Sequence, residues 1–314
     1  MLAKKRVISL VIISFALIVL ISCFSSAGIF EWLKSITGEA SQSQPVSLTI
    51  NISNVAPTIT IVDNVTAFDL TEDGYKAITI NTVINDGDNN SDIRTVFGNL
   101  TAPGEINRTG VACTAGPVNS YTSINYSCAF NMAYFEFAGS WSIAIWANDS
   151  VNNLASNITQ NITINSLKGI VTFPSTLTWG NIARAATNQT PTNSPLTINN
   201  TGNYNAKNIS VNSTDVVGDS DGAYGLWANN FTVATVNGTA ALLECQGSTT
   251  TGTTLMTNAA YTNISGSALN KANRTNAGTV GQEQLFFCLR TVGSELISQQ
   301  YSTTTKGSWT VKMV

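Results

Sequence analysis

The sequence predicts an all-β protein built from two tandem antiparallel β-sandwiches that follow an N-terminal leader. Three observations support this fold class. Apolar residues alternate with period two through most of the chain, Asn, Thr and Ser are abundant while helix-forming runs are sparse, and polar turn clusters separate the alternating segments. A chain of 314 residues fits two domains of roughly 120–150 residues each.

Residues 1–27 have the pattern of a secretory signal peptide. Three basic residues at positions 4–6 precede an apolar run over 7–22, and small residues lead to a cleavage point after Ala27. Two alternatives stay open: an uncleaved membrane anchor, or a lipidated N-terminus at Cys23, which follows Leu-Ile-Ser. Each interpretation places the rest of the chain outside the membrane, with membrane contact only through this segment.

Residues 28–45 read as a short amphipathic helix and a linker. Ile29, Trp32, Leu33 and Ile36 share one helical face, and Ser-Gln-Ser-Gln-Pro at 41–45 is typical of a linker. The helix either leads out of the leader or docks on a membrane surface or partner.

The two sandwiches are expected over 46–166 and 167–314. Strand candidates in the first half begin with VSLTINIS at 46–53, and those in the second half include ALLECQG at 241–247. Two related segments, GSWSIAIW at 139–146 and GSWTVKMV at 307–314, predict a late strand in each sandwich. In both, Gly-Ser forms the turn and the Trp side chain enters the core.

The composition excludes several kinds of function. The chain has no histidine, which rules out Ser-His-Asp and Cys-His catalysis and zinc bound through imidazole. Its net charge is −3, with no basic stripe left beyond the leader, so nucleic acid is not an expected partner. Acidic residues occur singly within the strand-like runs, with no facing pair as a glycosidase needs. We therefore expect no enzymatic activity, an extracellular hydrolase being the weakest of three options.

Four cysteines beyond the leader form an even set in an exported chain, two in each half. This distribution predicts disulfides Cys113–Cys128 and Cys245–Cys288. The chain-entropy model gives about 3 kcal/mol for the shorter loop and about 4 kcal/mol for the longer one.

Sequons of the form Asn-x-Ser/Thr are spread over both halves and predict an N-glycosylated extracellular surface, although Asn and Thr also suit turns and exposed strand faces. The candidate sites are Asn51, Asn64, Asn89, Asn99, Asn107, Asn125, Asn148, Asn157, Asn161, Asn188, Asn199, Asn208, Asn212, Asn230, Asn237, Asn263 and Asn273.

One loop has the spacing of a calcium site. Asp86, Asp88, Asn90 and Asp92 place oxygen ligands at loop positions 1, 3, 5 and 7, as in the first half of an EF-hand loop. Position 12 is Phe97 where an EF-hand has Glu. The competing interpretation, which the sequence favours, is a solvated Asx-rich hairpin turn between strands that end near Ile84 and start near Ile93.

Several segments resemble known protein families. Tyr126-Ser127-Cys128 resembles the Tyr-x-Cys of an immunoglobulin strand, but Cys113 is too close upstream to be the far-sheet partner, so the likeness is to Ig-like architecture only. PLTINNTGNYNAKNISV at 195–211 resembles a segment of TasA/camelysin-like fibre proteins and archaeal bundling-pilin domains. The whole pattern of leader, sandwiches, sequons and GSW strands resembles archaeal envelope proteins with stacked Ig-like modules.

These resemblances imply a structural protein of the cell envelope that contributes to a surface layer or filament, on the outside of the cell. The alternative is an adhesin or carbohydrate-binding module, with Trp179, Tyr224 and Trp227 as a sugar-stacking platform. The expected partners are other envelope subunits, or a second copy that donates a strand. In that model 46–53 adds to an open edge at 307–314, although the sequence favours 46–53 as the first strand of its own domain.

Overall fold

The protein is all-β in the computed structural model, which describes residues 46–314 apart from 62, 64–66, 106, 237–242, 247–252 and 273–280. Strands and three short 3-10 helices make up its regular structure in this part of the chain. The chain divides into two units, Met1–Ser53 and Asn54–Val314. The leader interpretations and the helix and linker of 28–45 lie outside the described residues. Within those residues, no helix is both long enough and apolar enough to span a membrane.

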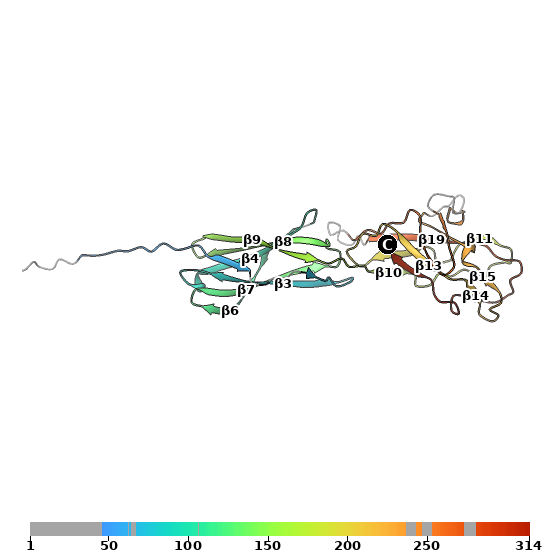
Figure 1. Cartoon of the computed structure of the whole chain (residues 1–314), viewed down its shortest axis with the longest axis horizontal. Helices are drawn as coiled ribbons and strands as arrows, with labels where there is room; N and C mark the ends of the chain where they lie inside the picture. Colours follow the sequence, from blue (N-terminus) through green and yellow to red (C-terminus); the bar gives the residue numbers. More distant parts are fainter. Residues whose placement is uncertain are drawn as a thin grey trace, which may run out of the picture. The chain divides into compact units, whose positions relative to one another are not determined.

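The first sandwich has two layers, which Figure 1 shows with β3 and β7 in one and β4, β8 and β9 in the other. The four-stranded sheet has the order β1 (Thr58–Ile61), β3 (Tyr75–Asn85), β7 (Ser123–Ala133) and β6 (Thr114–Ser120). The five-stranded sheet has the order β2 (Ala67–Phe68), β9 (Leu154–Ile164), β8 (Gly139–Asp149), β4 (Ile93–Thr101) and β5 (Arg108–Ala112). The pairing is antiparallel except between β2 and β9, where it is parallel.

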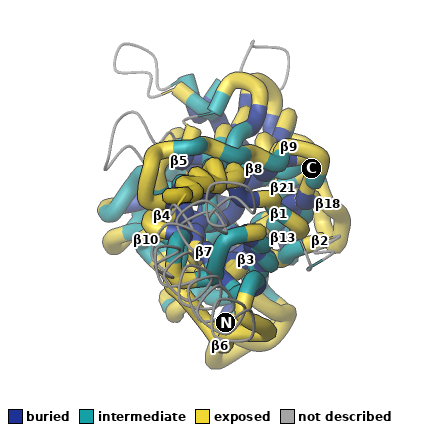
Figure 2. The backbone as a smooth tube through the Cα atoms, turned by 90° about the vertical axis from the view of Figure 1, so that its left-hand side faces the viewer, coloured by how far each residue is buried: buried dark blue, intermediate teal, exposed yellow. Residues whose placement is uncertain are grey.

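Alternation along the strands produces the core between these layers, since successive side chains of a strand point to opposite faces. Ile78, Ile80 and Ile84 of β3 are all buried, and Ile143 and Ile145 of β8 face them from the other sheet. Figure 2 colours the backbone by burial, with buried stretches inside the trace and exposed ones mostly around its outside. Each such side chain contributes roughly 1.5–3 kcal/mol of hydrophobic stabilisation.

A disulfide fixes the point at which the chain changes sheets. Cys113 lies between β5 and β6, which belong to opposite layers, and its backbone N–H donates to the Val96 carbonyl at 2.9 Å. It is bonded to Cys128 in the middle of β7. This first disulfide is the pair that the sequence predicts, and it ties the crossover to the far sheet.

The second half has its own hydrophobic core, enclosed by three sheets. The largest has the order β10 (Ile170–Phe173), β12 (Leu196–Asn200), β19 (Gly281–Thr291), β16 (Phe231–Ala234) and β17 (Thr253–Leu255), with β11 (Thr187–Gln189) also on β19. The others are β18 (Ala260–Asn263), β13 (Ile209–Ser213) and β21 (Thr310–Met313), and β15 (Gly225–Leu226), β14 (Val216–Gly218) and β20 (Tyr301–Ser302).

The strand predicted over 241–247 is wrong, because Leu243–Cys245 form a 3-10 helix, η3. Its carbonyls are satisfied by side chains of neighbouring strands instead of a strand partner: Thr253 donates to Leu243, and Thr232 donates to Glu244. Cys245 of this helix is bonded to Cys288 of β19, which forms the second disulfide.

The two GSW segments agree with the prediction in part: both Trp side chains pack against a core, but Gly139 and Ser140 already belong to β8, and only Gly307 and Ser308 precede their strand. Trp141 of β8 is fully buried and donates its indole N–H to the Phe137 carbonyl at 2.9 Å. Trp309, directly before β21, donates to the Thr214 carbonyl at 2.8 Å and packs edge-on against Phe231. The preceding glycines, Gly139 and Gly307, have φ angles of 148° and 95°, which side-chain-bearing residues rarely adopt.

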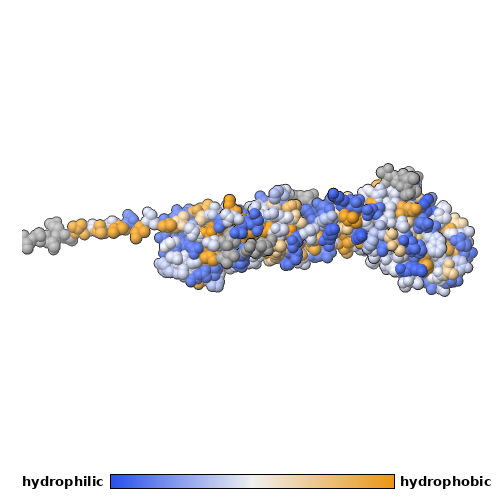
Figure 3. All heavy atoms as spheres, in the orientation of Figure 1, coloured by the Kyte–Doolittle hydropathy of each residue, from blue (hydrophilic) through white to orange (hydrophobic). Residues whose placement is uncertain are grey.

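The segment 46–53 does not form the first strand of the sandwich, contrary to the favoured prediction. Strand pairing begins at β1, and among the described residues 46–53 belongs to no sheet. Val46, Leu48, Ile50 and Ile52 are 87%, 81%, 72% and 88% exposed. Figure 3 shows the same segment as a line of hydrophobic atoms. Its apolar row therefore has the pattern of a strand but no pairing partner among the described strands.

The last strand, β21, lies at a sheet edge. It pairs with β13 on one side, and the order of that sheet gives it no second neighbour among the described strands. Val314 and Asn208 exchange backbone hydrogen bonds at 2.9 and 3.4 Å. Because antiparallel pairs alternate, the N–H and C=O groups of Val311 and Met313 point away from β13 toward the open edge.

Candidate metal centre

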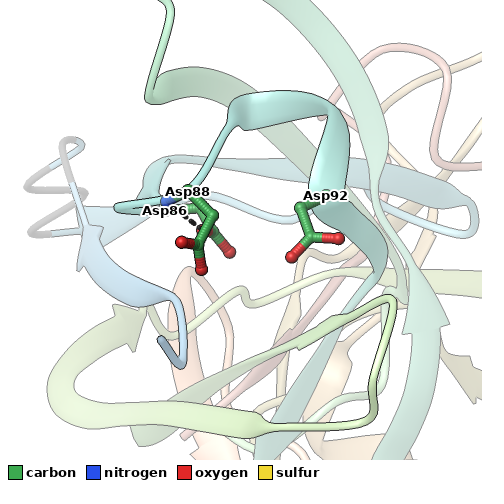
Figure 4. A group of neighbouring side chains, drawn as sticks. All are labelled: Asp86, Asp88 and Asp92. Atoms are coloured by element: carbon green, nitrogen blue, oxygen red, sulfur yellow. Dashed lines mark hydrogen bonds between the residues drawn. The ribbon is translucent and has the colours of Figure 1, made fainter. Parts of the chain in front are cut away.

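The loop between β3 and β4 gathers three carboxylates. Asp86, Asp88 and Asp92 each place an oxygen within 4.8 Å of the others, and Figure 4 shows the three side chains directed to the same side of the turn. The loop is not the predicted hairpin turn, because β3 and β4 belong to different sheets. It crosses between the two layers, and this crossing brings the buried end of β3 beside the start of β4.

Turn chemistry fixes the local geometry of this loop. A 3-10 helix, η1 (Asn90–Asp92), begins after Asn89, whose side-chain oxygen accepts from the Ser91 N–H at 2.9 Å. The Asn90 amide donates to the carbonyl of Ser120, the last residue of β6, at 2.7 Å. The loop therefore forms an Asx-type turn as well as a carboxylate cluster. Asn90, the fourth predicted ligand, donates its side-chain N–H to a backbone carbonyl of β6.

Asp86 is the deepest of the three carboxylates. It is fully buried, at 0% exposure, and its backbone N–H donates to the Thr122 carbonyl at 2.8 Å. Its Oδ1 accepts from the Asp88 N–H at 2.9 Å, whereas its Oδ2 is buried with no hydrogen-bond partner among the described residues. A buried acceptor without a partner is costly, and most so when it carries charge.

Asp88 and Asp92 are held by the segment that leads into the first sandwich. Asp88 Oδ2 accepts from the Val55 N–H at 2.7 Å, and Asp92 Oδ2 accepts from the Asn54 side-chain amide at 2.5 Å. Asp92 Oδ1 accepts from the Ser150 hydroxyl. The hydrogen bonds from Ser150 and then Asn54 lower the pKa of Asp92 below its ordinary value, because they favour the charged carboxylate.

The turn after β8 supports the centre from a distant part of the sequence. Asp149 is fully buried, and its carboxylate accepts from the Val151 and Asn153 N–H groups and from the Asn153 amide. The Asn153 amide also donates to Asn54 Oδ1 at 3.1 Å. Sequence reasoning missed these residues: the Asx-rich run 148–153 indicates a turn, but nothing local places it against Asp92.

The arrangement suits a hard divalent cation. The three carboxylates supply oxygen ligands, and within the described residues no lysine or arginine forms an ion pair with any of them. Calcium binds oxygen at about 2.3–2.6 Å, so ligands on opposite sides of the ion lie about 4.6–5.2 Å apart. The three oxygens lie within 4.8 Å of one another, no farther apart than two ligands of one calcium ion can be, and Asp86 Oδ2 has no hydrogen-bond partner among the described residues.

The other predicted sites are dispersed. Trp179 and Tyr224 pack against the second core, while Trp227 is 56% exposed, so the three aromatics do not form one exposed platform. None of the sequon asparagines in the described part of the chain is buried. Asn64, Asn237 and Asn273 lie outside that part. Asn157 differs from the rest in donating its amide to the Ile59 carbonyl of β1 at 2.9 Å.

The fold and site define an all-β protein of sandwich-like, disulfide-bonded domains with a carboxylate centre at a loop between sheets. No family model matches the chain. No curated protein matches it either, so the chain is not assigned to the fibre or envelope families that its sequence resembles. Among solved structures, a variant of the SrpA adhesin from Streptococcus sanguinis is similar at 12% identity with a TM-score of 0.26, over 47% of this chain and 90% of that one. At this level the similarity carries no functional argument.

Proposed function

We propose that the chain is an exported structural protein of the cell surface that assembles with copies of itself by strand addition, without catalysing a reaction. One observation carries this proposal: the segment 46–53 presents four alternating, exposed apolar side chains and pairs with no described strand. The segment has the residue pattern of a β-strand but belongs to no sheet among the described residues. Two disulfides agree with an oxidising, extracellular compartment.

The open edge of β21 is the complementary surface. Val311 and Met313 offer free backbone groups there, and their side chains are half-buried against the second core. An added strand would extend this core face with its apolar row, while Ser47, Thr49 and Asn51 would face solvent beside Thr310 and Lys312. The Asn51 sequon would thus remain accessible. A contact between different ends of two copies is heterologous and propagates as a filament unless it closes into a ring.

The test compares assembly of the mature protein with that of two variants. Replacing Leu48 and Ile50 by Asn removes half of the apolar row and should abolish oligomers in light scattering and electron microscopy. Replacing Ser47 and Thr49 by Ala, on the opposite face, should leave them intact. Val311→Pro removes one edge N–H outside the β13 ladder and should also block assembly, whereas Val311→Ala should not. Wild-type protein that stays monomeric at high concentration refutes the proposal.

We also propose that the carboxylate centre binds calcium, with the affinity of about 0.1–1 mM that is typical of extracellular sites. The buried, unpartnered oxygen of Asp86 supports this assignment, because a cation supplies the partner that the described residues do not. Titration calorimetry with calcium should show saturable binding to the wild type and none to Asp86→Ala. If calorimetry shows no heat of binding in millimolar calcium, the proposed metal site is refuted and the loop is an Asx-rich turn only.

A second candidate function is glycan binding by an adhesin. The exposed indole of Trp227 favours it, since an exposed aromatic face is the usual surface on which sugars stack. A glycan array separates the two functions. Saturable binding lost in Trp227→Ala supports the adhesin, and no binding supports a purely structural role.

A further inference from the structure

The carboxylate centre also holds the residues that directly follow the apolar segment 46–53. Asn54 bonds to Asp92, and the backbone N–H of Val55 bonds to Asp88. Asn54 is held a second time through its Oδ1, which accepts from Asn153. Two successive residues of the incoming chain are thus fixed by the carboxylates that would ligate the cation.

Some carboxylate oxygens of the centre hold Asn54 and Val55, while others are left to bind the cation. Asp88 Oδ2 and Asp92 Oδ2 are the acceptors for the incoming chain, while Asp86 Oδ2 has no partner among the described residues. A cation that binds Asp86 Oδ2 and the remaining oxygens would leave both bonds to Asn54 and Val55 in place. Without a cation, the carboxylates that accept from Asn54 and Val55 lie within 4.8 Å of Asp86 with no counter-charge among the described residues, and carboxylates at this distance repel one another when ionised.

We propose that calcium at Asp86, Asp88 and Asp92 is a latch that fixes Asn54 and Val55, and thereby sets where the free apolar segment begins. The inference rests on the proposed calcium binding. With calcium, the segment emerges from a fixed point at Asn54. Without calcium, the chain is first held at β1, which starts at Thr58, so the free tether is longer. Because coupling is reciprocal, loss of the Asn54 contact also weakens calcium binding.

Hydrogen exchange of the Val55 amide in the mature protein measures the latch directly. In calcium the amide should exchange about tenfold more slowly than in chelator, since exchange requires opening of its hydrogen bond. Asn54→Ala removes one of the two latch contacts and should reduce this protection. It should also weaken calcium binding by about three- to tenfold, as reciprocal coupling demands. Ser53→Thr, one residue upstream with an exposed side chain, is the matched control, since it keeps the Asn51 sequon, and it should change neither quantity.

The outcomes separate the latch from the proposed calcium binding. Saturable calcium binding with unchanged Val55 exchange overturns the latch alone. Wild-type calcium affinity in Asn54→Ala overturns it as well. No calcium binding at all overturns the proposed metal site and the latch with it, and leaves the proposed assembly by strand addition to its own test.

Discussion

Replacing Asp86 by Asn should change stability in opposite directions with and without calcium. In chelator the substitution keeps Oδ1 for the Asp88 N–H and puts an amide NH2 in place of the unpartnered Oδ2. That amide can donate to the carboxylates of Asp88 or Asp92. Since a buried unsatisfied acceptor costs about 1–3 kcal/mol, we expect Asp86→Asn to raise the free energy of unfolding by about that amount.

Calcium should make the wild type, and not Asp86→Asn, the protein with the higher free energy of unfolding. A ligand at a hundredfold excess over its Kd stabilises the folded state by about 2.7 kcal/mol. The wild type gains this increment, whereas Asp86→Asn lacks the ligand oxygen and gains little. The variant is thus expected to be the more stable protein in chelator and the less stable one in calcium.

Urea unfolding followed by tryptophan fluorescence measures both free energies. Asp149→Asn is the control, because that carboxylate is equally buried but fully hydrogen-bonded, so its loss should destabilise the protein in both solutions. If Asp86→Asn is destabilised by the same amount with chelator and with calcium, the unpartnered oxygen is not a ligand and the reasoning fails.

Three further predictions concern other contacts. Glu136→Gln should lower the free energy of unfolding by about 3–5 kcal/mol, because it leaves the buried Arg108 charge unpaired, and Glu136→Gln with Arg108→Met should recover part of that loss in a double-mutant cycle. Replacing the cysteines of the first disulfide by Ala should cost about 3 kcal/mol and those of the second about 4 kcal/mol, from their sequence separations of 15 and 43 residues, as measured by urea unfolding. Because its pKa is lowered in the folded protein, Asp92 binds fewer protons there than in the unfolded chain. The stability that this carboxylate contributes is therefore fully present above its unfolded pKa and is lost as the pH falls through its folded pKa. Ser150→Ala should move the Asp92 carboxyl titration, followed by NMR, to higher pH, and an unchanged midpoint would contradict the assigned cause.

The sequence alone determined the fold class and most strands, because strand alternation is a local property of the chain. Period-two burial in β3 and β8 follows directly from the order of apolar and polar residues. The two disulfides also follow from the distribution of the cysteines between the halves, and the Trp of each GSW segment packs against a core, fully buried at Trp141 and partly buried at Trp309. Where the local pattern misled, as at 241–247, side chains from β16 and β17 satisfied the backbone in place of a strand partner.

Only the tertiary structure decided which strands pair and what surrounds the carboxylates. The run at 46–53 alternates as well as any strand, but pairing depends on an available edge, and β1 occupies the edge of β3. Asp86, Asp88 and Asp92 are visible in the sequence, whereas Asn54 and Ser150 join Asp92 from 38 and 58 positions away, and Asn153 bonds to Asn54 across 99 positions. The unpartnered oxygen of Asp86 exists because β3 ends inside the sandwich and the loop crosses to the other sheet. Burial of that kind is a property of the packed layers, which no local spacing encodes.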